Sequence, residues 1–253
     1  MGSEKKYKTS CITSIFKASE WMESFLDDIT RQSIFEDIEF ILINANSPEK
    51  EEEEEVINRY LRENDNIKYE TLEEDPGVYE VWNTGVKKAK SEYLSNWNVD
   101  DKRHPEHIEK HAKCLDENPE VDLAYANVLM TCSKEDTYEN NNAVASYDMP
   151  EFSYENLLKC NMPHNCPVWR KSLHERYGYF RTDMVSAADF DFWLRAASDG
   201  SKFMGIDETL GLYYKNPSGI STKKETLSEA VKEVNDLRVK YSGLADYRNF
   251  VIK

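Results

Sequence analysis

The sequence predicts an α/β fold of Rossmann type, in which a mainly parallel sheet is flanked by helices. Apolar, strand-like stretches alternate with amphipathic helical patterns through the first half of the chain. The helical stretches are long enough to serve as the crossovers that parallel strands require. The chain has 253 residues, of which 40% are hydrophobic, so it can bury the core of one large domain.

The first half of the chain predicts four strands separated by three helices. Continuous apolar stretches predict the strands, at residues 11–16, 38–43, 67–71 and 93–99. Apolar side chains at helical spacing predict the helices, which begin near Ser19, Ser47 and Val78. The acidic run 51–55 falls in the early turns of the second helix, where we expect it to be solvated.

The second half of the chain is less regular. Periodicity predicts helices at 105–117, 153–159 and 188–198, and strands at 121–131, 203–206 and 210–214. The polar, Asn-rich stretch 133–150 is expected to be a mobile loop, and apolar residues between Leu227 and Tyr241 line a closing amphipathic helix. No linker or repeat divides the chain, so we expect a single domain.

The charge balance excludes several classes of partner. With 48 acidic and 32 basic residues the net charge is −16, which disfavours nucleic acid and anionic membranes. No apolar run is long enough for a transmembrane segment, and the N-terminus does not resemble a signal peptide. The expected location is cytoplasmic, with peripheral association with a membrane left open.

Two carboxylates stand where a predicted buried strand ends. Ligands of parallel sheets bind beyond the carboxyl ends of the strands, and Asp100 and Asp101 follow the strand at 93–99. Hard oxygen ligands of this kind suit Mg²⁺ or Mn²⁺ bound to a diphosphate. Because Asp-Asp is also common in ordinary loops, the position at a strand end is what favours a metal site.

A second acidic pair begins a predicted helix. Asp189 is either an N-cap or a general base that takes a proton from a substrate hydroxyl, and the two roles are compatible. His104, His107 and His111 share one helix face, but no carboxylate or cysteine completes a zinc set, so we expect surface histidines. The sequence has no G-x-G-x-x-G, P-loop or G-x-S-x-G motif.

Taken in order, several segments resemble those of family 2 glycosyltransferases of GT-A fold. The resemblance runs from about Ser10 to Thr222 and rests on five matches: 13–16 after the first strand, 44–47 after the second, the G-x-Y-x-x-x-N-x-G segment 77–85, 97–101 as the metal motif, and 178–180 with 189–195 as the aromatic and acidic segment. The resemblance implies a tail or tag remnant at 1–9, a catalytic domain at 10–222 and a C-terminal helix and tail at 223–253. Within the domain, it implies a nucleotide-binding half at 10–104 and an acceptor-binding half at 105–222.

The resemblance also implies an activity and a set of site residues. The activity is transfer of a sugar from a nucleotide-diphosphate sugar, with UDP-sugar favoured, to a hydroxyl of a glycan, lipid-linked or protein acceptor, with inversion and with Mn²⁺ or Mg²⁺. Asp189 is then the general base, followed by Asp191, and Asp100 and Asp101 are the metal ligands. Donor contacts are implied for Thr13, Ser14, Phe16, Asn44, Asn46, Gly77, Asn83, Asn98, Val99 and Asp100. Acceptor contacts are implied for His164 and Trp169, although a large aromatic such as Trp169 is more often buried in a core.

Three departures from the family pattern leave an alternative open. Asn44 and Asn98 stand where the family has Asp, and Ala188 stands where it has Glu. An amide oxygen still accepts a hydrogen bond but carries no charge, and its NH₂ group adds a donor. The alternative is a degenerate relative that binds a nucleotide or a glycan without turnover. A nucleotidyltransferase is less well supported, because no Gly-rich, basic phosphate loop follows the first strand.

Overall fold

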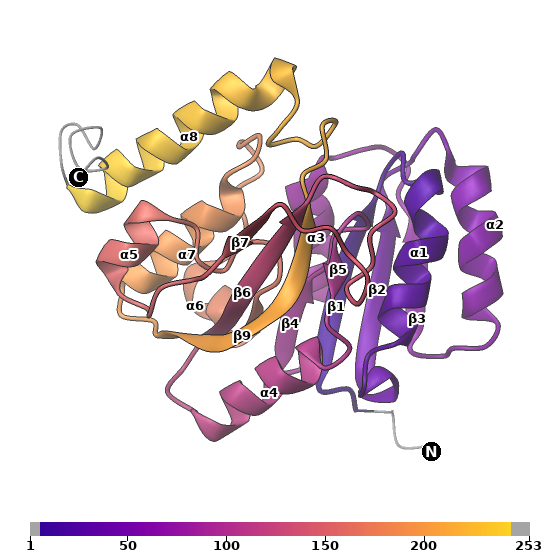
Figure 1. The fold of residues 1–253 in the computed structure, drawn as a ribbon, viewed down its shortest axis with the longest axis horizontal. Coiled ribbons are helices and arrows are strands. Elements are labelled where there is room, and N and C mark those ends of the chain that lie inside the picture. Colours follow the sequence, from indigo (N-terminus) through magenta and orange to yellow (C-terminus); the bar gives the residue numbers. More distant parts are fainter. Residues whose placement is uncertain (1–5, 244–253) are drawn as a thin grey trace.

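The computed structural model describes residues 6–243 and confirms the predicted α/β class (Figure 1). One continuous sheet runs in the order β3-β2-β1-β4-β8-β6-β9-β5, with β7 paired to β6. Its strands are β1 (Thr9–Ile15), β2 (Ile38–Asn44), β3 (Ile67–Thr71), β4 (Tyr93–Asn96), β5 (Lys102–Arg103), β6 (Leu123–Thr131), β7 (Ala145–Tyr147), β8 (Val168–Arg170) and β9 (Phe203–Tyr214). The tag remnant expected at the N-terminus and the tail expected at the C-terminus lie, over 1–5 and 244–253, outside the described residues.

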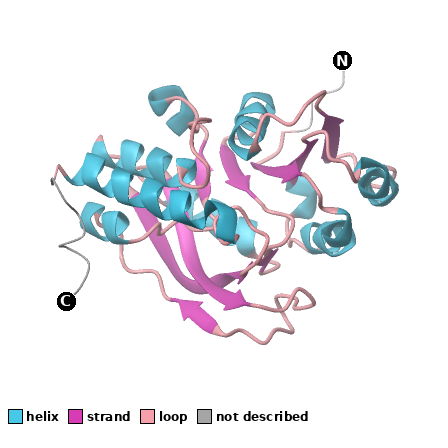
Figure 2. Cartoon of the chain, turned by 90° about the horizontal axis from the view of Figure 1, so that it is seen from above, coloured by secondary structure: helices cyan, strands magenta, loops and turns pink. Residues whose placement is uncertain are grey.

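Helices cover both faces of the sheet (Figure 2). They are α1 (Ser19–Thr30), α2 (Lys50–Leu61), α3 (Val78–Lys88), α4 (His107–Glu117), α5 (Tyr154–Lys159), α6 (Ser172–Tyr177), α7 (Ala188–Ser198) and α8 (Lys224–Ser242), with a 3₁₀ turn at Phe35–Asp37. Alternate strand residues point to opposite faces. Cys11 and Phe40 accordingly pack with α1, α2 and α4, whereas Ile12 and Ile41 pack with α3, α5, α6, α7 and α8.

The strands β1 to β4 pair in parallel with one another, whereas the rest of the sheet mixes parallel and antiparallel pairs. In the first half β1 is parallel to both β2 and β4, and β2 is parallel to β3. In the second half β8 runs antiparallel to β4 and β6, whereas β6 and β9 are parallel. Because β1 and β4 are parallel neighbours, Ile15 and Asn96 bring their following loops to the same edge of the sheet.

Several elements of the second half differ from the sequence-based expectation. The two short strands expected at 203–214 form one strand, β9, whose pairing with β6 is interrupted by register shifts at Asn127. The stretch expected as a loop contains β7, and Asp136 accepts hydrogen bonds there from the Thr131 hydroxyl and the Asn142 amide. Strands of two or three residues, such as β5 and β8, are too short to show a period in the sequence.

The expected helix starts and the solvated acidic run are partly wrong. The N-cap positions of α1 and α2 are Ala18 and Glu49, and neither makes a side-chain cap. Glu53 in the acidic run is fully buried. Its carboxylate accepts hydrogen bonds from the Ala18 amide at 2.8 Å and the Ser47 hydroxyl at 2.9 Å. A buried carboxylate requires such partners, so Glu53 ties the start of α1 to the end of β2.

The histidines of α4 are not surface residues as expected. His107 and His111 are fully buried, with ring centroids 4.1 Å apart. Each Nδ1 lies within hydrogen-bond distance of a backbone carbonyl, that of Leu210 or of His107. Burial lowers the pKa of both rings, that of His111 to about 3. They are therefore neutral core residues.

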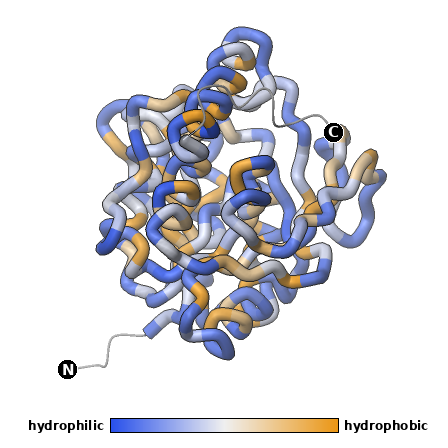
Figure 3. The backbone as a smooth tube through the Cα atoms, turned by 90° about the vertical axis from the view of Figure 1, so that its left-hand side faces the viewer, coloured by the Kyte–Doolittle hydropathy of each residue, from blue (hydrophilic) through white to orange (hydrophobic). Residues whose placement is uncertain are grey.

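Hydrophilic and hydrophobic residues alternate along the backbone in most parts of the chain (Figure 3). This alternation is what half-buried helices and strands require. Within residues 6–243, no helix combines the length and the apolar character needed to cross a bilayer.

Candidate active site

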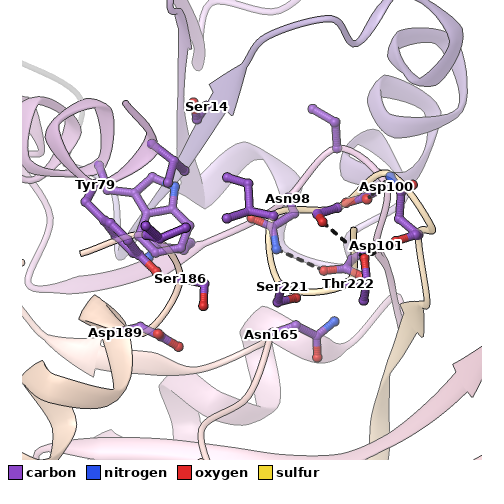
Figure 4. Close-up of a pocket in the computed structure, with 18 of the residues that line it drawn as sticks. Ser14, Tyr79, Asn98, Asp100, Asp101, Asn165, Ser186, Asp189, Ser221 and Thr222 are labelled. Carbon is purple, nitrogen blue, oxygen red and sulfur yellow. Dashed lines mark hydrogen bonds between the residues drawn. The ribbon is translucent and has the colours of Figure 1, made fainter. Parts of the chain in front are cut away.

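A cavity of about 900 Å³ lies beyond the carboxyl ends of β1 and β4, at the edge the sequence indicated (Figure 4). Ser14 near the end of β1, Phe16 just after that strand, and the loop 98–101 after β4 form one side of it. The other lining segments include the starts of α1, α3 and α7, the turn 161–167, residues 213–223 at and beyond the end of β9, and α8. The second half of the chain therefore contributes most of the wall.

The start of α3 approaches the cavity because of two glycines. Gly77 is the N-cap of α3 and has a φ of +85°, a conformation that favours glycine. Gly85 lies further along α3, and a Cβ at this position would be 2.3 Å from a side-chain carbon of Ile12 in β1. The close packing that Gly85 permits holds α3 against the sheet, so that Tyr79 and Trp82 reach the cavity.

The acidic pair after β4 lies in the cavity wall. Asp101 is 1% exposed, and its two carboxylate oxygens accept hydrogen bonds from Asn98 Nδ2 at 3.1 Å and the Tyr214 amide at 3.2 Å. Asp100 is half-buried and accepts one from Asn216 Nδ2 at 2.9 Å. Burial raises the pKa of Asp100, and burial together with Asp100 raises the pKa of Asp101 to about 7.

These contacts give the two carboxylates different roles in the wall. One oxygen of Asp101 is bonded to Asn98 in the same loop and the other to the Tyr214 amide at the end of β9, so Asp101 holds the loop against β9. Asp100 has the carboxylate oxygen that remains for a ligand. Over residues 6–243, no group of at least three His, Cys, Asp or Glu side chains is arranged to hold a metal ion.

Asp189 faces the acidic pair from the opposite side of the cavity (Figure 4). It stands in the first turn of α7 and accepts a hydrogen bond from Asn161 Nδ2 at 2.8 Å. Burial raises its pKa, while the bonds from Asn161 and the Phe190 amide act in the opposite direction. A partly desolvated, oriented carboxylate with a raised pKa is suited to accept a proton.

Asp191 does not share this position, although it is only two residues away. Its side chain is 1% exposed and lies outside the lining of the cavity. It is paired with Arg195 at 3.2 Å and Lys240 at 3.1 Å, and it accepts a hydrogen bond from the Tyr241 hydroxyl. Residues two apart on a helix point in different directions, so Asp191 faces α8 and not the cavity. It holds α7 to α8, and the expectation that Asp191 is a second base is corrected.

Two of the expected donor contacts, Asn44 and Asn83, are instead buried residues whose hydrogen bonds hold segments of the fold together. Asn44 is fully buried, and it donates to Glu53 at 2.7 Å and accepts from the Ser47 amide at 2.8 Å. Asn83 pairs with both the amide and the carbonyl of Phe180. With both ends of each amide engaged, neither side chain is available to a ligand.

The remaining predicted residues divide between the cavity and other places. The residues that line the cavity are Ser14, Phe16, Gly77, Asn98, Val99, Asp100, Asp101, His164 and Asp189. Thr13 is fully buried in β1, and Asn46 is exposed outside the cavity lining. Trp169 is fully buried and donates to His174 Nε2 at 3.1 Å, so it is a core residue and not an acceptor contact.

His164 lies in an aromatic corner of the cavity. Its ring lies 5.3 Å from that of Tyr147 and 5.0 Å from that of Tyr213, measured between centroids. Its φ is +48°, an uncommon backbone conformation for a residue other than glycine. Burial lowers the pKa of the ring, which keeps it neutral. A neutral imidazole between two phenol rings is suited to contact a sugar ring.

Sequence reasoning missed several polar residues that the fold brings to this site. Asn161 orients Asp189, and Asn216 contacts Asp100. Tyr79 and Lys223 also line the cavity. Tyr79 stood in a motif, but the others lie in turns without a recognisable pattern, and their position depends on how the second half folds back over the sheet.

The comparisons with known proteins agree with this geometry. The family described as "Glycosyl transferase family 2" matches residues 10–176. An uncharacterised glycosyltransferase of Methanocaldococcus jannaschii, MJ1057, is 23% identical over 223 residues, which cover 86% of this chain and 74% of that protein. A second relative, the uncharacterised glycosyltransferase EpsJ of Bacillus subtilis, is 24% identical over 84% of this chain and 62% of its own length.

Solved structures show the same fold at low sequence identity. Residues 1–349 of S. aureus TarS in complex with UDP-GlcNAc superpose with a TM-score of 0.73 and 17% identity, over 92% of this chain and 67% of that one. The mannosyltransferase PcManGT of Pyrobaculum calidifontis, in complex with GDP-Man and Mn²⁺, gives a TM-score of 0.70 and 14% identity, over 93% of this chain and 65% of that one. This chain therefore spans about two thirds of the length of these neighbours.

The fold and its carboxylate-lined cavity define a glycosyltransferase of GT-A fold. The match over 10–176, which covers most of the chain, places the protein in glycosyl transferase family 2.

Proposed function

We propose that the chain transfers a sugar from a nucleotide-diphosphate sugar to an acceptor hydroxyl, with inversion at the anomeric carbon. The observation that carries the proposal is that Asp189 and Asp100 line the same cavity from opposite sides. A transferase of this kind must remove a proton from the attacking hydroxyl and stabilise a departing diphosphate. In the proposal, Asp189 takes the first task and Asp100 contributes to the second.

The proposed reaction balances on the residues of this cavity. The acceptor hydroxyl oxygen forms a bond to the anomeric carbon from the side of Asp189, and its proton passes to the Asp189 carboxylate. The bond from that carbon to the diphosphate oxygen breaks, and the nucleoside diphosphate leaves with the electron pair. Attack from the face opposite to the leaving group inverts the anomeric carbon. The raised pKa of Asp189 favours its role as the base.

The residues near Asp100 fit a divalent ion such as Mn²⁺ or Mg²⁺. The side-chain oxygens of Asp100 and Asn98 are hard donors, the type that these ions prefer, and both residues line the cavity. Mg²⁺ sites often use one or two carboxylates together with substrate phosphates, so a small protein ligand set is sufficient. When bound, the ion would supply charge neutralisation at the diphosphate. PcManGT was solved with GDP-Man and Mn²⁺, which supports this assignment.

Donor and acceptor have separate places in the proposal. Ser14, Phe16 and Gly77 line the side of the cavity near β1, where the nucleotide would bind. UDP-sugars are the favoured donors, and the UDP-GlcNAc complex of TarS supports this choice. His164 and Tyr213 would contact the acceptor, for which a glycan, a lipid-linked molecule and a protein are all candidates.

The experiment that tests the proposal is a panel of UDP-, GDP-, dTDP- and CDP-sugars with and without Mn²⁺. We expect one nucleotide class to raise the Tm in the presence of Mn²⁺, because a ligand that binds the folded state stabilises it. Slow hydrolysis of the same donor would show that the site is catalytic. The proposal is wrong if no donor either binds or is hydrolysed. Tight donor binding without hydrolysis or transfer would instead support a binding module, the alternative that Asn44, Asn98 and Ala188 leave open.

A further inference from the structure

One carboxylate of the closing helix α8 binds the backbone that immediately precedes α7. Glu233 of α8 accepts hydrogen bonds from the backbone amides of Val185 at 2.6 Å, Ser186 at 2.9 Å and Ala187 at 3.1 Å. Hydrogen bonds to a charged acceptor are roughly twice as strong as neutral ones. The backbone immediately before α7 is therefore held by a single side chain of α8.

These amides belong to the wall that carries the proposed base. Val185, Ser186, Ala187 and Asp189 all line the cavity, whereas Glu233 lies outside the lining and holds the segment from behind. The negative charge of Glu233 also stands at the N-terminus of α7, where a helix dipole favours an anion. Ala188, at the position where a Glu was expected, has no carboxylate to do this from within α7.

The backbone amides around the start of α7 each have a hydrogen-bond acceptor. Glu233 takes the three amides before the helix. The Ala188 amide is bonded to the hydroxyl of Tyr79, and the Phe190 amide to the carboxylate of Asp189 itself. A mobile segment at 185–187 would change the direction of the first turn of α7, and with it the position of the Asp189 carboxylate.

We propose that Glu233 is a positioning residue for Asp189: it fixes the backbone of 185–187 so that the Asp189 carboxylate faces the acceptor hydroxyl. The expected effect on catalysis rests on the proposed function, in which Asp189 is the general base. Glu233 touches no substrate. Its contribution is the pre-organisation of the base, whose loss is costly because small displacements of reacting groups slow a reaction strongly.

A second attachment of α8 provides the matched comparison. Lys240 and Tyr241 hold Asp191, and Arg238 donates to the carbonyl of Leu158 at 2.9 Å. Removing the Lys240 charge loosens α8 without touching the amides at 185–187. If Glu233 acted only by anchoring α8, variants at Glu233 and at Lys240 would have the same effect on turnover.

The test compares Glu233→Ala and Glu233→Gln with Lys240→Met and Glu229→Ala, the last an exposed acidic residue one turn earlier on α8. For Glu233→Ala we expect kcat per folded molecule to fall about tenfold or more, with the KM for the donor within about twofold of wild type. We expect the kcat of Glu233→Gln to lie between those of wild type and Glu233→Ala. The Gln amide oxygen still accepts a hydrogen bond, but its NH₂ group would face the backbone N–H donors. Lys240→Met and Glu229→Ala should keep kcat within about twofold of wild type.

Amide hydrogen exchange of the same proteins tests the contact without any substrate. Exchange at 185–187 should be faster in Glu233→Ala and unchanged in Glu229→Ala. The proposal is overturned by unchanged exchange at 185–187, by a kcat for Glu233→Ala within about twofold of wild type, or by an equal fall in Lys240→Met. Absence of turnover by the wild-type protein with every donor would count against the proposed function alone, while the exchange result would still decide whether Glu233 holds the segment.

Discussion

The two halves of the chain use their polar residues in opposite ways. In the half formed by β1 to β4, the motif residues Asn44 and Asn83 bond to Glu53 and to the Phe180 backbone. In the other half, Asn161 and Asn216 occupy turns without a motif, and both donate to carboxylates in the cavity wall. Asn98 is the exception in the first half, because it donates to Asp101 in the cavity wall. Asn44 and Asn83 show that a polar residue in a family-like motif can hold the fold together without contacting a ligand.

The largest expected effect separates two carboxylates on one helix. Asp189→Asn should lower sugar transfer at least about 100-fold with donor binding retained, because the general base is lost. Asp191→Asn should keep the turnover of folded molecules but cost about 2 kcal/mol of stability, since the partly exposed Arg195 and Lys240 lose their charged hydrogen-bond partner. Transfer assays and urea unfolding measure the two effects. Loss of transfer in folded Asp191→Asn, with Asp189→Asn active, would reverse the assignment.

The next prediction tests whether Asn44 has a structural role and does not contact the nucleotide. Asn44→Asp restores the residue typical of the family, yet it would face the Glu53 carboxylate, which now accepts a bond from Asn44 Nδ2 at 2.7 Å. Two buried carboxylates at this distance repel, so we expect a loss of about 3 kcal/mol and no gain in donor affinity. Asn46→Asp, at an exposed neighbour, serves as control and should change stability by less than about 0.5 kcal/mol. Tighter donor binding by Asn44→Asp would show that position 44 does contact the nucleotide.

A smaller effect concerns the metal side of the cavity. Asp100→Asn should remove the part of the UDP-induced stabilisation that depends on Mn²⁺, up to about 2.7 kcal/mol when the ligand is present at about 100 times its Kd. Asp148→Asn, at an exposed aspartate, should leave that stabilisation unchanged. Differential scanning fluorimetry with UDP, with Mn²⁺ and with both gives the comparison. An unchanged Mn²⁺ effect in Asp100→Asn would place the ion elsewhere.

The last prediction is a pH dependence of folding stability that arises from a buried histidine in the core. The unfolded chain protonates His111 near its ordinary pKa of 6.5, whereas burial lowers the folded pKa to about 3. The unfolded state therefore binds more protons between these values, and stability falls as the pH falls, by about 1.4 kcal/mol per pH unit. His111→Phe should flatten this slope relative to wild type, measured by urea unfolding from pH 7 to 4. Equal slopes in both proteins would mean that His111 is not buried in neutral form.

Much of the fold could be predicted from the sequence because its causes are local. Apolar stretches such as 38–43 and the helical spacing from Val78 to Ala89 correspond closely to β2 and α3. The short strands β5, β7 and β8 could not be predicted, since segments of two or three residues carry no period. His107 and Glu53 were expected on the surface and are buried. Polarity alone did not indicate that specific partners would compensate for their burial.

The sequence by itself determined the alternation of elements and the edge of the sheet where the site lies, and the order of its motifs indicated the family. These depend on periodicity and on the rule that parallel strands end at one edge. Only the tertiary structure decided that Asp189 lines the cavity while Asp191 is buried in ion pairs, and that Glu233 meets the amides before α7. Such choices depend on contacts between segments far apart in the chain, and the residues involved carry no local pattern that records them.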